Sequence, residues 1–229
     1  MMLQDLIDNF ADWESLVRIW PLLAQGLWVT VKLALVALPL GMAAGLLVGL
    51  SCALGGRAVR IGLLCWIDLF RAFPVLVLLV LIYYGLPFLG FTLPAFAATV
   101  LALVLNNSGY YGEIFRAGLA SIPHGQREAA AALGLSPLRA MLLVVLPQAL
   151  RAVIAPLASN SLELVKATSI AAMVALPELL RSARVAQEQT YNPTPLMAAA
   201  VLYFVLLWPF AHAVARLERR MLKASGVGR

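Results

Sequence analysis

Long apolar runs are the feature that most constrains how this chain folds. From Leu27 to Leu54 the single charge is Lys32, and from Leu196 to Ala215 there is none. Runs of about 20 apolar residues match the hydrocarbon core of a bilayer, where helices satisfy their own backbone hydrogen bonds. The runs do not alternate as the strands of a membrane barrel would. They therefore predict an all-α, polytopic membrane protein.

Composition and charge agree with this class. Hydrophobic residues make up 62% of the chain and charged residues 12%, whereas a soluble domain has about 25% charged residues. The net charge of +6 is interpreted as basic cytoplasmic loops, and no nucleic-acid partner is expected. Cys52 and Cys65 lie in or beside apolar runs, so free thiols are expected. The acidic start, MMLQDLIDNFADWESL, lacks the basic residues of a signal peptide.

Five membrane spans are predicted, with no long soluble insert, so one domain is expected over residues 1–229. The spans are Leu27–Leu54, Ile61–Leu86, Ala95–Gly118, a long and broken span from Pro147 to just before Arg181, and Leu196–Ala215. The segment RSARVAQEQTYNPTP before the last span is expected to be a loop or a surface helix.

The first span carries Gly41, Gly45 and Gly49 at intervals of four residues. This spacing leaves one helix face nearly bare, and such faces allow membrane helices to approach closely. The glycines therefore predict tight helix packing.

The basic residues predict the orientation of the chain. Arg57, Arg60, Arg127 and Arg139 fall on the same side as the basic C-terminal tail. Short loops rich in arginine and lysine favour the cytoplasm, which places the N-terminus outside and the C-terminus inside. Arg181 and Arg184 then fall outside, against this rule.

A half-polar segment, GQREAAAALGLSPLRAMLLVVLPQAL (Gly125–Leu150), interrupts the membrane pattern. Its alanine-rich start, Glu128–Leu133, is a strong helix former, and Glu128 near the helix start would complement the helix dipole. Gly134 permits the left-handed conformation that ends a helix. The spacing predicts a short helix with a smooth alanine face that another protein's groove could accept. An ordinary amphipathic loop helix is the alternative.

A second helix is predicted directly after Gly134. Ser136 can cap its start, and Pro137 suits its first position. Pro147 is expected to mark the entry into the fourth span.

The same segment resembles the cytoplasmic loop of permeases of ABC importers. That family's pattern is Glu-Ala-Ala, three residues, Gly, nine residues, Ile, one residue and Leu-Pro. The matching positions are Glu128, Ala129, Ala130, Gly134, Val144, Leu146 and Pro147, of which Val144 alone differs.

The flanking segments are similar to permeases for polar amino acids such as histidine, glutamine and arginine. They are LIYYGLP, GEIFRAGLASIPHGQREAAAALGLS, LPQALRAVIAPLASNSLELVKATSI and LPELLRSA, and the resemblance covers about Leu27 to Arg219. Ala72-Phe73 stands where the family often has Gly-Thr, and Ala167 where an acid is frequent. These departures leave the substrate open, and ELVKATS also resembles permeases for compatible solutes such as ectoine.

The resemblance implies a type I ABC importer permease fold in a bacterial inner membrane. It implies that the first loop helix docks on a separate ATP-binding subunit, that a second permease subunit completes the pathway, and that an extracytoplasmic binding protein delivers the substrate. The second permease is either the same chain or a sister chain. The implied coupling residues, in a loop of about 119–147, are Arg127, Glu128, Ala129, Ala130, Gly134 and Pro147.

No Gly-x-x-x-x-Gly-Lys-Ser/Thr loop for nucleotide phosphates occurs in the sequence. The chain is therefore expected to be no enzyme and to bind no cofactor, with ATP and Mg on the partner. His124 and His212 have no ligand-spaced Cys or carboxylate, so no metal site is expected. A stand-alone secondary transporter or channel is the alternative of another class. Such transporters often carry internal repeats, and no clear repeat is seen.

Polar residues inside the predicted spans are candidates for the substrate pathway, because ionisable groups at membrane depth usually mark functional sites. They are Asn106, Asn107, Ser108, Tyr110, Asn160, Glu163, Lys166 and Thr168. The asparagines could instead hold helices together. Glu163 and Lys166 could pair with each other, or could meet the ammonium and carboxylate of a zwitterionic substrate. Glu113 could pair with Arg116.

Overall fold

The structure, a computed structural model, describes residues 12–224, and every regular element in that range is helical. The main helices are α2 (Trp13–Leu54), α3 (Arg57–Ala72), α4 (Val75–Val80), α5 (Ala95–Ala120), α6 (His124–Ala132), α7 (Pro137–Ala140), α8 (Leu146–Ala167), α9 (Leu179–Thr190) and α10 (Thr194–Ala224). Two short segments are π-helical, η1 (Leu81–Gly85) and η3 (Met141–Val145). Two others are 3-10 helices, η2 (Leu86–Leu89) and η4 (Thr168–Val174).

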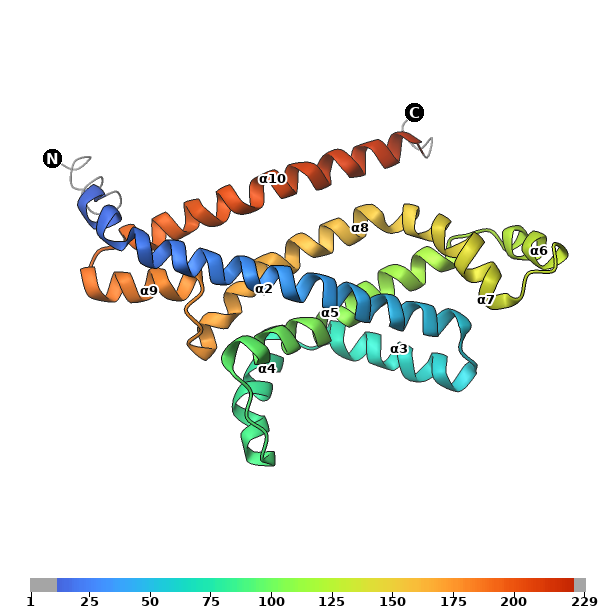
Figure 1. Cartoon of the computed structure of the whole chain (residues 1–229), viewed down its shortest axis with the longest axis horizontal. Coiled ribbons are helices and arrows are strands. Elements are labelled where there is room, and N and C mark those ends of the chain that lie inside the picture. Colours follow the sequence, from blue (N-terminus) through green and yellow to red (C-terminus); the bar gives the residue numbers. More distant parts are fainter. Residues whose placement is uncertain (1–11, 225–229) are drawn as a thin grey trace.

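The long helices lie roughly along one direction and give the molecule two distinct ends (Figure 1). The start of α2, the start of α10 and α9 lie at one end. The turn from α2 to α3, the small helices α6 and α7, and the end of α10 lie at the other. The elements that carry the arginines assigned to the cytoplasmic side therefore share one end of the molecule, which we call the basic end.

Three helices of the described residues are long and apolar enough to cross a membrane: Trp13–Leu54, Pro137–Val174 and Thr194–Leu217. The bent pair Arg57–Ala72 and Val75–Leu89 makes a fourth if it is counted as one span. The predicted third span, α5, is not among them. It is 26 residues long, but its middle, NNSGYYGE, lowers its mean hydropathy, and six of these eight residues are buried among other helices.

The first and last spans are longer than predicted. α2 begins at Trp13, because Asp12 caps it by accepting hydrogen bonds from the N–H groups of Glu14 (3.0 Å) and Ser15 (3.3 Å). α10 runs from Thr194 to Ala224. The end of α2 at Leu54 and the start of α5 at Ala95 match the prediction.

The predicted second span, Ile61–Leu86, is sharply bent. α3 ends at Ala72, and the following helix leaves at an angle of 98°. Phe73 is extended, with φ −83° and ψ 124°, because the ring of Pro74 excludes helical conformations from the residue before it.

The glycine face of α2 packs against α5, as predicted. Gly41, Gly45 and Gly49 are all buried. A Cβ atom on Gly49 would lie 2.7 Å from the Cβ of Phe115, and one on Gly45 would overlap the Cβ of Tyr111. The close approach of the two backbones therefore requires Gly45 and Gly49, whereas a Cβ on Gly41 would come no closer than 3.4 Å to Asn107.

Gly45→Val is expected to lower the free energy of unfolding by about 3 kcal/mol, because the added side chain forces α2 and α5 apart. Thermal denaturation of the purified chain in detergent measures the effect. Gly62→Val is the matched control, since Gly62 also lies in a helix but has no atom within 4 Å of its added Cβ. Equal melting temperatures for the two variants would contradict the close packing of α2 against α5.

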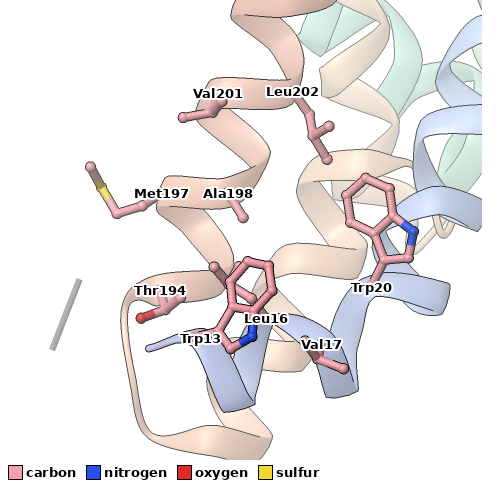
Figure 2. A pocket seen from close by; sticks show the side chains of 9 residues that line it. All are labelled: Trp13, Leu16, Val17, Trp20, Thr194, Met197, Ala198, Val201 and Leu202. Carbon is pink, nitrogen blue, oxygen red and sulfur yellow. The ribbon is translucent and has the colours of Figure 1, made fainter. Parts of the chain in front are cut away.

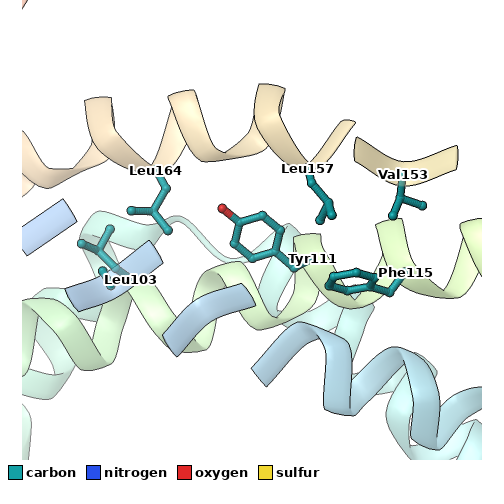
Figure 3. Packing of buried hydrophobic residues seen from close by; sticks show 7 residues of the cluster. Leu103, Tyr111, Phe115, Val153, Leu157 and Leu164 are labelled. Carbon is teal, nitrogen blue, oxygen red and sulfur yellow. The ribbon is translucent and has the colours of Figure 1, made fainter. Parts of the chain in front are cut away.

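The interior core joins α5 to α8 (Figure 3). Leu103, Tyr111 and Phe115 from α5 pack with Val153, Leu157 and Leu164 from α8. Tyr111 is fully buried, and its ring stands between the two helices. The two helices that flank the half-polar loop are thus packed directly against each other.

The fourth span begins earlier than predicted. Helical structure is continuous from Pro137 to Val174, so Pro147 is not its entry. The turn before Pro147 widens instead: the N–H of Leu146 bonds to the carbonyl of Met141, five residues back. A proline inside a helix removes one hydrogen bond and clashes with the preceding turn, and the wide turn η3 relieves that clash.

The break in the fourth span lies at Ala175, which has φ 56° and ends η4. Pro156 does not interrupt α8. The segment predicted as a loop or surface helix is the helix α9, and one of its faces is buried against α2 and α10.

Candidate functional site

The half-polar loop folds as two helices around a sharp turn at the basic end (Figure 1). Gly134 has φ 76°, and its N–H bonds to the carbonyl of Ala131 at 2.9 Å. The hydroxyl of Ser136 accepts the N–H of Arg139 at 3.5 Å and starts α7. These roles of Gly134 and Ser136 confirm the predicted turn.

The first loop helix, α6, begins four residues before Glu128. Pro123 is its N-cap residue, with φ −55° and ψ 140°. The prediction that Glu128 complements the dipole at the helix start is therefore wrong, because Glu128 lies in the second turn.

Only part of the family's Glu-Ala-Ala motif lies on the exposed face of α6. Glu128 and Ala129 are exposed, but Ala130 is 2% exposed and faces the rest of the chain. Leu133, which the sequence did not single out, is 82% exposed. Ala130 thus seats α6 on the chain, and Ala129 and Leu133 offer a small apolar surface to another molecule.

Arg127 ties α6 to the end of α5. Its Nη2 donates a hydrogen bond to the carbonyl of Leu119 at 3.1 Å. Its Nε is buried and has no partner among the described residues. The side chain is therefore part of the attachment of α6 and not a free surface charge.

Two of the predicted pathway residues hold the helices together. Asn106 is 7% exposed and donates to the carbonyls of Phe70 (2.8 Å) and Phe73 (3.2 Å), so it fastens the bend between α3 and α4. Ser108 accepts the indole N–H of Trp66 at 3.0 Å. Their hydrogen bonds are those expected of helix packing.

A second polar contact links α5 to α8. Asn160 donates to the side-chain oxygen of Asn107 at 3.0 Å. Beside it, the hydroxyls of Tyr111 and Ser161 lie 2.8 Å apart. Thr168 is buried and donates to the carbonyl of Val165 at 2.7 Å, within its own helix. The side chains of Asn107 and Thr168 thus make their hydrogen bonds within this chain.

Three predicted pathway residues remain on the surface. Glu163 and Lys166 form an ion pair of 2.7 Å, as the alternative interpretation predicted, with side chains 67% and 48% exposed. Tyr110 is 36% exposed, and its hydroxyl donates to the carbonyl of Arg71 at 3.2 Å. Charged groups in a membrane helix avoid lipid, so this face of α8 must meet water, a solute or another protein.

The suspected Glu113–Arg116 pair is present near the end of α5. Two nitrogens of Arg116 donate to the two carboxylate oxygens of Glu113, each at 2.7 Å. Such a two-point pair has a fixed geometry. Glu113 is thereby committed to a structural contact.

Sequence reasoning missed a buried acid at the opposite end. Glu178 is fully buried, and its carboxylate accepts hydrogen bonds from the N–H groups of Leu180 (3.0 Å) and Arg181 (2.7 Å) and from the hydroxyl of Tyr203 (2.7 Å). Next to it, Thr30 accepts the N–H of Leu179 at 3.1 Å. This network ties α2, α9 and α10 together. Its only signal in the sequence was a glutamate after Pro177, at a helix start.

Glu178→Ala is expected to lower the free energy of unfolding by about 3 kcal/mol, because buried N–H and O–H groups lose their acceptor. The melting temperature in detergent reports the loss. Glu188→Ala is the control, since Glu188 is an exposed acid on the same helix. A Glu178→Ala variant as stable as the control would show that water replaces the carboxylate without cost.

An apolar cavity of about 620 Å³ lies between the starts of α2 and α10 (Figure 2). Trp13 and Trp20 stand on the α2 side, and Met197 and Val201 on the α10 side. Thr194 is its one polar lining residue. The cavity is large, but its lining has no charged group that could bind a charged solute.

Comparison with known proteins gives one family over most of the chain. Residues 21–223 match the family described as binding-protein-dependent transport system inner membrane component. The Escherichia coli glutamine transport system permease protein GlnP is 32% identical over 213 residues, which cover 92% of this chain and 97% of that protein. The Bacillus subtilis arginine transport system permease protein ArtQ is 32% identical over 217 residues, with the same coverage.

Solved structures of ABC transporters are similar to this chain in fold. A chain of an amino acid ABC transporter crystallised with histidines has a TM-score of 0.82 and 34% identity, and the match covers 92% of this chain and 99% of that one. The inward-facing methionine transporter MetNI has a TM-score of 0.73 at 24% identity, over 87% and 95% of the two chains. This second likeness shows the fold alone.

Proposed function

This chain belongs to the family of inner membrane components of binding-protein-dependent transport systems, and from that premise we propose that it forms the pathway for a polar amino acid. It is a multi-pass membrane subunit of an ATP-driven importer. The ATPase of such an importer is a separate subunit, so the chain is a transport subunit and not an enzyme. A stand-alone transporter is not favoured, because the relatives are components of ABC importers.

The observation that carries the proposal is the exposed two-helix tip formed by α6 and α7. Glu128, Ala129, Ala130 and Gly134 of the family's loop pattern lie there, and the turn requires the positive φ of Gly134. The small apolar surface of Ala129 and Leu133 suits a cleft in an ATP-binding partner. We propose that the loop of about 119–147 is the coupling segment and that ATP and Mg are bound by that partner.

The orientation follows from the charges. The basic end carries Arg57, Arg60, Arg127 and Arg139 and lies in the cytoplasm. The N-terminus and α9 lie at the outer face, where an extracytoplasmic binding protein delivers the solute.

The polar amino acid is supported by two features. The surface pair Glu163–Lys166 offers both charges that a zwitterion needs. Permeases for glutamine and arginine are similar over nearly the whole chain. A second permease subunit would cover this face of α8 and complete the pathway.

Co-expression with the ATP-binding subunit, the second permease and the binding protein tests the proposal. The affinity-tagged chain is expected to copurify with the ATPase, and the reconstituted complex is expected to take up a polar amino acid only when ATP is present. Ectoine and a neutral sugar serve as comparison solutes. Uptake by the chain alone, without ATP, would contradict the assignment.

A further inference from the structure

A basic cavity lies at the basic end, where α2 and α5 finish and α6 begins. It has a volume of about 280 Å³, and its lining includes Arg60, Arg116, His124 and Arg127. These four side chains come from α3, α5 and α6. The rest of the lining is apolar.

The charges in this cavity do not cancel. Glu113 holds Arg116 in a two-point ion pair, and Asp68 is also close enough to act on Arg116. Arg60 and Arg127 have no ion pair among the described residues. Arg127 also keeps a buried Nε without a partner. The cavity therefore retains positive charge and an unused donor.

An apolar cavity of about 350 Å³ adjoins the basic one. The two share Ala53 and Arg127. Leu54, Leu135, Met141 and Val145 are among the other lining residues, and all residues of this wall except Arg127 are apolar. A ligand that fills both cavities needs an anionic group next to a hydrocarbon chain.

We propose that the two cavities together bind an anionic phospholipid of the adjacent leaflet. Its phosphate lies among Arg60, Arg116 and Arg127, and one acyl chain lies in the apolar cavity. Basic pockets between membrane helices are known to take such headgroups, and anionic lipid is attracted by about 1 kcal/mol per arginine near the surface. Free phosphate carries the same chemistry but gains nothing from the apolar cavity.

The proposed lipid site lies where α6 is attached to α5. Arg127 belongs to α6, and its bond to Leu119 joins α6 to α5. A lipid phosphate between Arg127 and Arg60 adds a link from α6 to α3. The proposal does not depend on which solute is transported, because its residues are separate from the α8 surface.

The test measures binding of dioctanoyl-phosphatidylglycerol to the purified complex of the full chain by native mass spectrometry. Arg60→Gln is expected to weaken binding roughly fivefold, since about 1 kcal/mol is lost with one arginine. Arg60 is exposed, so this change leaves folding intact. Arg57→Gln is the control, since Arg57 is a neighbouring exposed arginine outside the cavity lining. It is expected to bind as the wild type does.

Two further ligands separate the possible sources of the phosphate. Dioctanoyl-phosphatidylcholine carries the same phosphate, but its choline cation offsets the negative charge, so it is expected to bind more weakly than the anionic lipid. Glycerol 3-phosphate, which lacks acyl chains, is expected to bind more than tenfold more weakly than the anionic lipid, because each buried CH₂ contributes about 0.8 kcal/mol. Equal affinity of the wild type and Arg60→Gln for the anionic lipid would overturn the site. Equal affinity for glycerol 3-phosphate and the lipid would also overturn it, in favour of a free-anion site.

Discussion

Gly134→Pro is expected to reduce ATP-driven uptake at least about 100-fold while the chain still inserts into the membrane. Proline fixes φ near −65° and removes the backbone N–H. Gly134 needs φ 76° and donates its N–H to Ala131. The substitution therefore opens the turn between α6 and α7 and displaces the surface of Ala129 and Leu133, and the ATPase loses its contact.

The measurement is uptake by the reconstituted complex, together with the ATPase subunit retained on the tagged chain. Gly125→Ala is the matched control, because Gly125 is in α6, has open space around it and has no positive φ. It is expected to transport normally. Wild-type uptake by Gly134→Pro would mean that the turn has no part in coupling.

Glu163→Gln and Lys166→Gln are each expected to lower uptake roughly 10- to 100-fold. A hydrogen bond to a charged group contributes about 1.5–3 kcal/mol, and each variant removes one charge that a zwitterionic solute would meet. The two residues are exposed, so little stability should be lost. Uptake and the stimulation of ATPase activity by loaded binding protein are the two readouts.

The double variant Glu163→Lys with Lys166→Glu separates structure from transport. It keeps an ion pair of the same spacing on α8 but reverses the positions of the charges. If the pair only stabilises the helix, the double variant transports as the wild type does. If each charge meets its counterpart on the solute, the double variant stays defective, and that is the expected result.

Much of the loop could be predicted because its determinants are local. The positive φ of Gly134 and the cap at Ser136 follow from residue type and spacing, and the structure confirms them. Outside the loop, the glycine face of α2 was predicted in the same way and is also confirmed. The outward direction of Leu133 and the inward direction of Ala130 could not be predicted. They depend on where α6 packs, which no local pattern contains.

The roles of the polar residues in the spans could not be predicted from the sequence. Composition marked Asn106, Asn107 and Glu163 alike as polar groups at membrane depth. The structure separates them by partner: Asn106 bonds to carbonyls at a bend, Asn107 bonds to Asn160, and Glu163 is exposed. Glu178 was missed because its bonds to Leu180 and Arg181 are local, but its burial and its bond to Tyr203 depend on helices distant in the chain.

The unbroken helical course from Pro137 to Val174 has a consequence for how force passes through the molecule. It starts beside the α6–α7 turn and contains Glu163 and Lys166, so one continuous helical segment connects the tip to the surface that would face the solute. The widened turn before Pro147 is the place where such a segment yields most easily. If the proposed partner moves the tip, we therefore expect the movement to reach Glu163 chiefly as a tilt or rotation of α8.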